Sequence, residues 1–241
     1  MSDSSDSQVS IVVISLKRRR PYDYSIEPVL TALWGAHTYS RIVSPLDAIW
    51  QLAFHPPTAA VITDEAIASR ANWHVLLFLL HYVRQGGTAV FMGDFPRYMS
   101  ADRVRAFFSR FGLPWKYSSL NTLPMFQNRL AVGWQRLEGR GRNRPMPPVF
   151  HLRGVYLKGV LPRDMLYQTT DPTDDSEGAA EGAATPVSTP HQTDVSRDDA
   201  KCNDGETAIA VAEVGRGKLC YVGEILRTTE CSEIILALCG L

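Results

Sequence analysis

Charged side chains directly follow several apolar segments of the chain. They are Lys17, Arg18, Arg19 and Arg20 after the first segment, Asp64 and Glu65 after the third, Asp94 and Arg97 after the fourth, and Glu224 after the last. Arginine binds phosphate or carboxylate groups through two parallel hydrogen bonds, and carboxylates accept hydrogen bonds from hydroxyl or amine groups. The pattern predicts a pocket for a small anionic or polyhydroxylated ligand, with ligand-binding residues Arg18, Arg19, Arg20, Asp64, Asp94 and Arg97.

The same carboxylates could also carry out acid–base chemistry. The pairs Asp64/Asp94 and Asp94/Glu224 could serve as acid and base if burial separated their pKa values. Asp94 and Glu224 are therefore the candidate catalytic residues. The alternative is structural: residues 18–20 form a solvated loop, and Asp94 caps the turn before Pro96. The sequence favours this structural alternative, because acids at successive strand ends are common in α/β sheets.

Alternating strand and helix patterns would bring these residues to one edge of a sheet. Continuous apolar runs predict strands over 9–16, 39–43, 59–64 and 88–93, and helical spacing predicts helices over 24–36, 46–54, 73–83 and 100–112. Strand–helix repeats indicate right-handed crossovers and a parallel sheet. Ligands of such sheets bind beyond the carboxyl ends of the strands.

The second half of the chain is predicted to contribute further strands and a closing helix. Strands are expected over 115–119, 130–134 and 149–157, a hairpin over 207–225 with its turn at 215–217, and a helix over 230–241. We therefore predict an α/β fold, a three-layer, doubly wound and mainly parallel sheet with a C-terminal antiparallel hairpin.

Charge is unevenly distributed, although the formal net charge is zero. Residues 171–206 are acidic and nearly lack large apolar side chains, so we expect a disordered insertion. Residues 1–8 are expected to be disordered as well. The segment after the insertion is too short for a core of its own. Residues 9–241 are therefore expected to form a single domain that contains the insertion.

Several classes of protein and partner are excluded by composition. No apolar run approaches the ~18 residues of a membrane span, and the acidic start is unlike a secretory signal. The four cysteines and six histidines lack metal-ligand spacing, so we expect no metal, no cofactor and no disulfide framework. The Arg/Gly-rich residues 136–145 lack interleaved aromatic side chains, which argues against a nucleic-acid partner. We expect a cytoplasmic or nuclear protein that binds a small anionic ligand or a protein; its oligomeric state is left open.

Two segments resemble a known family. HYVRQGGTAVFMGD (81–94) resembles the corresponding segment of class I glutamine amidotransferase-like proteins, and AVAEVGRGKLCYVGEI (210–225) resembles their last hairpin. TAVFMG, FGLPWK and GKLCYVGE are also similar to a group of fungal proteins of uncharacterised function. The resemblance implies a flavodoxin-like α/β fold.

The catalytic residues of that family are missing from this sequence. The family carries a cysteine nucleophile on a strand-to-helix turn, where this chain has Gly93, or Asp94 if the turn is shifted by one. The family's histidine base precedes a glutamate after the last strand, where this chain reads Tyr221-Val222-Gly223-Glu224, with glycine in place of histidine. Thiol-based amide hydrolysis requires a nucleophile and a base, and both are missing at these positions. The resemblance implies a non-catalytic domain, a pseudoenzyme.

Two functional classes follow from this comparison. The first is a non-catalytic module that binds a ligand or a protein. The alternative is a hydrolase or transferase that acts on a small anionic substrate with the strand-end carboxylates and arginines. Cys231, predicted in the first turn of the last helix, could be a reactive thiol, but a half-buried packing residue is the favoured interpretation.

Overall fold

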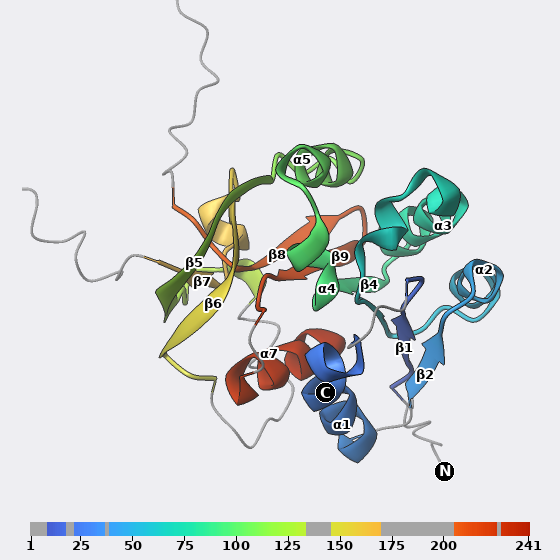
Figure 1. Cartoon of the computed structure of the whole chain (residues 1–241), viewed down its shortest axis with the longest axis horizontal. Helices are drawn as coiled ribbons and strands as arrows, with labels where there is room; N and C mark the ends of the chain where they lie inside the picture. Colours follow the sequence, from blue (N-terminus) through green and yellow to red (C-terminus); the bar gives the residue numbers. More distant parts are fainter. Residues whose placement is uncertain (1–8, 18–21, 37–38, 134–145, 170–204, 226–227) are drawn as a thin grey trace, which may run out of the picture.

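Six strands form the central sheet of the protein. The computed structural model describes residues 9–17, 22–36, 39–133, 146–169, 205–225 and 228–241. The strands of this sheet, sheet A, are β1 (Ile11–Ile14), β2 (Tyr39–Ile42), β3 (Ala59–Ile62), β4 (Thr88–Phe91), β8 (Ile209–Val214) and β9 (Gly217–Val222). Their spatial order is β2-β1-β3-β4-β9-β8, and all except β8 run parallel (Figure 1).

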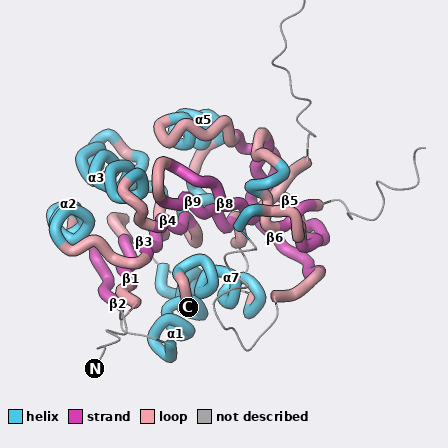
Figure 2. The backbone as a smooth tube through the Cα atoms, turned by 180° about the vertical axis from the view of Figure 1, so that it is seen from behind, coloured by secondary structure: helices cyan, strands magenta, loops and turns pink. Residues whose placement is uncertain are grey.

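Helices cover both faces of sheet A. Helices α1 (Tyr22–Ala36) and α7 (Thr229–Cys239) lie on one face, and α2 (Pro45–Phe54), α3 (Trp73–Arg84) and α5 (Ala101–Ser109) lie on the other (Figures 1 and 2). Strand β1 is buried on both sides, with Ile11 and Val13 in the α1/α7 core and Val12 and Ile14 in the α2/α3 core. Burial on both faces explains its continuous apolar run. The predicted three-layer α/β fold is confirmed.

The C-terminal hairpin differs in one respect from the prediction. Strands β8 and β9 pair antiparallel around Gly215, whose φ is 65°. However, β9 also pairs in parallel with β4, so that only β8 is antiparallel within sheet A. Strand β9 is almost wholly buried, as a strand between two neighbours should be.

A second, antiparallel sheet was not predicted. This sheet, sheet B, has the order β6-β5-β7 and consists of β5 (Lys116–Gln127), β6 (Val149–Lys158) and β7 (Tyr167–Gln168). The strand predicted over 130–134 is wrong for its described residues: Leu130 and Ala131 lie in a turn and residues 132–133 are helical, whereas β5 extends through Gln127. The side chain of Asn128 organises this turn, because its amide donates to the carbonyls of Pro162 and Met165 and its oxygen accepts from Leu130 N.

Four short helical segments were also missed. They are α4 (Asp94–Tyr98), directly after β4, and the 3₁₀ turns η1 (Glu65–Ala68), η2 (Arg70–Asn72) and η3 (Pro162–Asp164). Segments this short lack the periodicity from which helices are predicted. Two of them matter for the strand-end residues, because η1 follows β3 and α4 follows β4.

The predicted disordered segments fall mostly outside the described residues. Residues 1–8 and 171–204 are in this group. Gly205 and Glu206, predicted at the end of the insertion, are described, and the Glu206 carboxylate accepts hydrogen bonds from the hydroxyls of Ser118 and Ser119 on β5. In the described part of the chain, no helix has the length and apolar character that a membrane span requires.

Sheet B is joined to sheet A where β6 crosses the end of β9. Val155 N donates to Gly223 O at 2.8 Å, and Ile225 N donates to Arg153 O at 3.0 Å. The backbones approach so closely that a Cβ at Gly154 would lie 2.4 Å from Gly223 O, and one at Gly223 would lie 2.1 Å from Val155 O. Both positions therefore require glycine.

We expect Gly154→Ala to lower the free energy of unfolding by roughly 2–4 kcal/mol, because the added methyl group meets backbone that cannot move aside without separating the sheets. Urea unfolding measures this change. Gly205→Ala is the control, since its methyl group would make only ordinary contact with Met165, 3.7 Å away. Equal stability of the two variants would contradict the close crossing.

Candidate functional site

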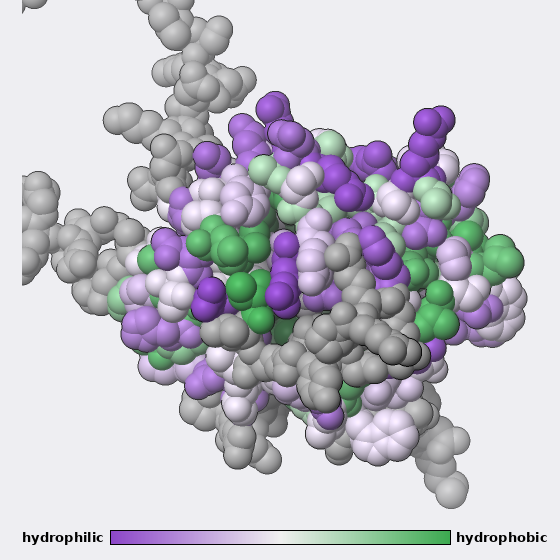
Figure 3. All heavy atoms as spheres, viewed as in Figure 1, coloured by the Kyte–Doolittle hydropathy of each residue, from purple (hydrophilic) through white to green (hydrophobic). Residues whose placement is uncertain are grey.

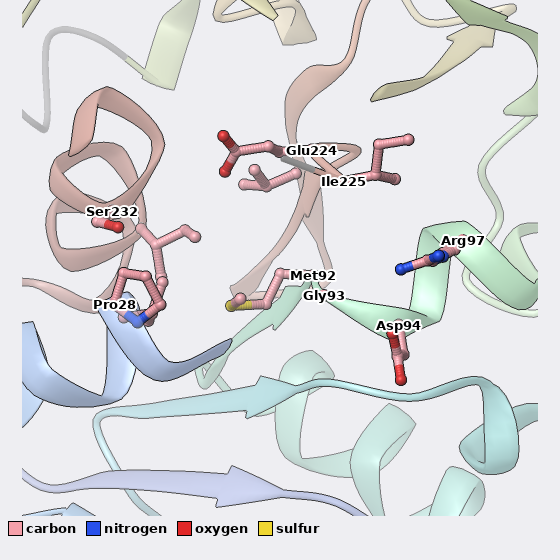
Figure 4. A pocket seen from close by; sticks show the side chains of 11 residues that line it. Pro28, Met92, Gly93, Asp94, Arg97, Glu224, Ile225 and Ser232 are labelled. Atoms are coloured by element: carbon pink, nitrogen blue, oxygen red, sulfur yellow. The ribbon is translucent and has the colours of Figure 1, made fainter. Parts of the chain in front are cut away.

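A narrow hollow lies beyond the carboxyl ends of β4 and β9, at the edge where the sequence predicts a site. Its cavity volume is about 20 Å³, room for about one water molecule, and the hollow is open to solvent on one side. The hollow is lined by side chains from four parts of the fold (Figure 4): Met92, Gly93, Asp94 and Arg97 of the β4–α4 segment, Val222 at the end of β9 with Glu224 and Ile225 after it, Pro28 and Val29 of α1, and Ser232 and Ile235 of α7. Apolar side chains from four parts of the fold thus surround a few polar groups, the kind of lining that small-molecule sites have.

Gly93 forms the sharp turn between β4 and α4. Its φ of 67° and ψ of −121° belong to a region that residues with a side chain rarely adopt. The turn is held because Asp94 N and Phe95 N both donate to Thr63 O, at 2.8 and 3.1 Å. A Cβ at Gly93 would lie 2.9 Å from Ile26 Cγ2. The packing therefore leaves no room for a side chain at this turn.

Glu224 lies at the end of β9 and is held by the start of α7. Its carboxylate accepts a hydrogen bond from Thr228 N at 2.7 Å. Burial raises the pKa of Glu224 to about 7, although hydrogen bonds from Thr228 and Cys231 act in the opposite direction. A carboxyl group with this pKa exchanges its proton near neutral pH.

Asp94 and Glu224 line the same hollow but do not converge. Figure 4 shows the Glu224 carboxylate pointing toward α7 and the Asp94 carboxylate pointing away from it. Asp94 is buried and is the first residue of α4, whereas Gly93 occupies the N-cap position. Asp94 is therefore not the N-cap residue of this helix. A shared proton between the two acids has no support in this geometry.

Asp64 has a structural role outside the hollow. Its carboxylate caps η1 by accepting from Ala66 N and also accepts from Lys17 N, both at 3.0 Å. Burial raises the pKa of Asp64, and these backbone hydrogen bonds partly offset the rise. The neighbouring Glu65 accepts from Lys17 Nζ at 3.1 Å. These bonds connect the ends of β1 and β3, and Asp64 is not among the residues that line the hollow.

Of the predicted arginines, the structure describes Arg97. Its side chain is exposed at the rim of the hollow, with its guanidinium carbon 5.5 Å from the centre of the Tyr98 ring. Arg18, Arg19 and Arg20 lie outside the described residues, so their predicted role stays a prediction. The structure thus brings together Asp94, Arg97 and Glu224.

The apolar wall of the hollow was missed by sequence reasoning. It consists of Met92 and Val222 at the ends of their strands, Pro28 and Val29 on α1, and Ile235 on α7. Met92 and Val222 directly precede Gly93 and Gly223, the positions compared with the family's catalytic residues. They could have been included on that ground. The residues of α1 and α7 carry no local signal, because their place depends on how these helices pack on the sheet.

Cys231 is a packing residue. Its side chain is fully buried in the first helical turns of α7, and burial raises the pKa of the thiol well above its usual value. It is thus more buried than predicted, and a reactive thiolate is disfavoured there. In the described part of the chain, no group of three or more His, Cys, Asp or Glu side chains could hold a metal ion.

Comparison with solved structures identifies the fold. A ThuA-like protein from Bacteroides uniformis ATCC 8492 has a TM-score of 0.56 and 8% identity, covering 96% of this chain and 89% of its own. A ThuA-like protein from Parabacteroides merdae ATCC 43184 has a TM-score of 0.53 and 10% identity, covering 97% and 88%. ThuA-like proteins have the class I glutamine amidotransferase-like fold. This chain has that fold.

A further solved structure is also similar. The β-galactosidase from Bacillus circulans sp. alkalophilus has a TM-score of 0.53 and 9% identity, covering 96% of this chain and 30% of the enzyme. No protein-family model and no curated protein sequence matches the chain. The likeness therefore concerns the fold alone, and the resemblance to fungal sequences stays a prediction.

The structure shows the surroundings of Gly93 and Gly223, the two positions where the sequence lacks the family's catalytic residues. Gly93 occupies the strand-to-helix turn after β4, and Ile26 packs over it. Neither Val222 nor Gly223, the two residues before Glu224, has an ionisable side chain. A side chain at Gly223 would also collide with the backbone of β6. Both positions thus lack a nucleophile or base, and neighbouring atoms crowd the space that a side chain would occupy there.

We expect Gly93→Ala to lower the free energy of unfolding by roughly 2–4 kcal/mol, because it combines backbone strain with the contact to Ile26. Gly112→Ala is the matched control, since Gly112 also has a positive φ, of 79°, but nothing lies within 4 Å of its Cβ position. Chemical denaturation of both variants separates strain from crowding. An equal loss in the two would show that Ile26 yields at little cost.

Glu224 is expected to make stability depend on pH. Its pKa is about 7 in the folded protein and near its ordinary value of 4.5 in the unfolded chain, so the folded state holds the proton more tightly. The free energy of unfolding should therefore fall as pH rises from 4.5 through 7. Glu224→Gln, which stays neutral and still accepts from Thr228 N, should exceed wild type by roughly 1–3 kcal/mol at about pH 8 and match it at about pH 4.5.

Thermal and urea unfolding across this pH range measure the difference. Glu27→Gln, which changes an exposed acid on α1, serves as the control and should follow the wild-type pH profile. If the free energy of unfolding of Glu224→Gln changed with pH in the same way as that of wild type, burial would not raise the pKa of Glu224.

Proposed function

We propose that this protein is a non-catalytic amidotransferase-like domain that binds a small molecule in the hollow between β4, β9, α1 and α7. The ligand class is an anion with an apolar part. Its anionic group would pair with Arg97 at the rim, and its apolar part would lie against Met92, Ile225 and Ile235.

The observation that carries the proposal is the closure of both catalytic positions by packing. A Cβ at Gly93 would lie 2.9 Å from Ile26 Cγ2, and a Cβ at Gly223 would lie 2.1 Å from Val155 O. The thiol nearest the hollow in sequence, Cys231, is fully buried and its pKa is raised. These features support a domain that keeps the ligand edge of the fold without chemistry for amide hydrolysis.

Arg97, the cation of the lining, supports the ligand class. Arg97 is exposed, so its guanidinium can make two charge-assisted hydrogen bonds with a carboxylate or phosphate. The Ser232 hydroxyl is already used, because it donates to Thr228 O at 3.2 Å. Glu224, with a pKa of about 7, could accept from or donate to a hydroxyl or amine group on the ligand.

One observation favours the alternative, a hydrolase or transferase for a small anionic substrate. A pKa near neutrality suits a general acid or base, and Glu224 has one. The divergence of Asp94 and Glu224 in Figure 4 disfavours it, because no second group is directed at the same reacting atom. Hydrolysis of a small phosphate or carboxylate ester that is lost in Glu224→Gln would support the alternative.

Binding of hexanoate, with hexanol as the uncharged analogue, tests the proposal by titration calorimetry and NMR. We expect hexanoate to bind more tightly than hexanol and to shift the resonances of Met92, Ile225 and Ile235. Arg97→Gln should weaken hexanoate binding about tenfold or more, the effect of losing one charged hydrogen-bond partner. Arg105→Gln, on the exposed part of α5, is the matched control and should bind like wild type.

Two results would contradict the proposal. One is hexanoate binding that does not differ between the Arg97 and Arg105 variants. The other is release of ammonia from glutamine by purified wild-type protein, abolished by Cys231→Ser. The absence of that release, together with the binding pattern above, would support a binding domain.

A further inference from the structure

Helix α2 exposes a stripe of large apolar side chains. Leu46, Trp50 and Phe54 follow one another at intervals of four residues, so they share one face of the helix. They are 77%, 55% and 69% exposed, whereas Ala48 and Leu52 on the opposite face are buried in the core. A surface helix normally presents polar side chains to water. The reversed pattern marks this face, the α2 stripe, as a site of contact.

The α2 stripe lies at one lateral edge of the molecule. Figures 1 and 2 both place α2 beside β2, the strand at the end of sheet A. Figure 3 shows hydrophobic side chains gathered over α2 at the right-hand edge of that view. Val43, between β2 and α2, is 56% exposed and extends the apolar surface toward the strand. Among the described residues, β2 pairs only with β1.

We propose that the α2 stripe is the interface of a symmetric dimer, in which it packs against the α2 stripe of a second copy of this chain. The stripe and Val43 together expose on the order of 450 Å² of apolar side chain, given the ~150–250 Å² of an aromatic residue. A stable interface buries about 800 Å² on each partner, of which somewhat more than half is apolar. The exposed apolar area therefore matches one side of a standard dimer.

The stripe is complementary to itself. Trp50 lies midway between Leu46 and Phe54, so a two-fold axis at Trp50 would place each Leu46 against the Phe54 of the other copy. Trp50 packs with Phe54 and with His55, at ring distances of 6.3 and 4.2 Å, so its side chain is already held in place.

Like charges would be kept apart in such a dimer. Asp47 is the one charged residue in the sequence of α2, and it lies near the start of the helix. In an antiparallel pair, the two Asp47 carboxylates would lie at opposite ends of the contact. The two carboxylates would therefore not face one another.

Sedimentation equilibrium and light scattering of the full chain test the dimer. We expect wild type to have a mass near twice 26.8 kDa at micromolar concentration. Trp50→Glu should raise the dimer dissociation constant by roughly a hundredfold or more, because it removes two central aromatic anchors and buries two charges. Leu130→Glu is the matched control, since Leu130 is 89% exposed away from α2, and it should dimerise like wild type.

The secondary structure and thermal unfolding of both variants should resemble those of the wild-type monomer, because both side chains are exposed in the fold. A wild-type chain that remains monomeric at about 100 μM would overturn the proposal. The α2 stripe would then be a contact site for a different protein. A Trp50→Glu dimer as stable as wild type would overturn it as well, because the interface would then lie elsewhere.

Discussion

The crossing of β6 over the end of β9 fixes the geometry on which the candidate site depends. It is a contact between backbones, with Val155 N donating to Gly223 O and glycines at 154 and 223. Tyr221 reinforces it, because its hydroxyl donates to Val155 O at 3.0 Å. A contact this close holds sheet B against sheet A and leaves no space for a side chain at Gly223. It also sets where the chain leaves β9, so that Glu224 points toward α7.

The elements of sheet A could be predicted because most of them are buried on both faces. Strands β1, β3 and β4 read as continuous apolar runs, and the helices between them carry apolar residues at helical spacing. The place of β9 could not be predicted, since a hairpin pattern shows that β8 and β9 pair but does not show that β9 joins β4 on its other side. Sheet B was missed because β5 is half exposed and carries polar residues without a clean alternation.

The sequence predicted where the candidate site lies, but not the directions of its side chains or its apolar wall. Parallel topology brings the strand-end residues to one edge, and Asp94, Arg97 and Glu224 do line one hollow there. The direction of each side chain depends on its neighbours. Asp64 is used by backbone groups of Ala66 and Lys17, and Asp94 points away from Glu224, which no local pattern records. The apolar wall from α1 and α7 depends on helix packing for the same reason.

The side chain of Ile26 limits which substitutions the turn at Gly93 accepts. It occupies the volume above Gly93 into which a residue at this turn would project. Replacement of Gly93 by cysteine or serine would therefore require Ile26 of α1 to shift or to be replaced by a smaller residue. A base at 223 would need a rearrangement of β6 as well. A nucleophile at 93 and a base at 223 would thus each need a compensating change in a second element of the fold, which no single substitution supplies.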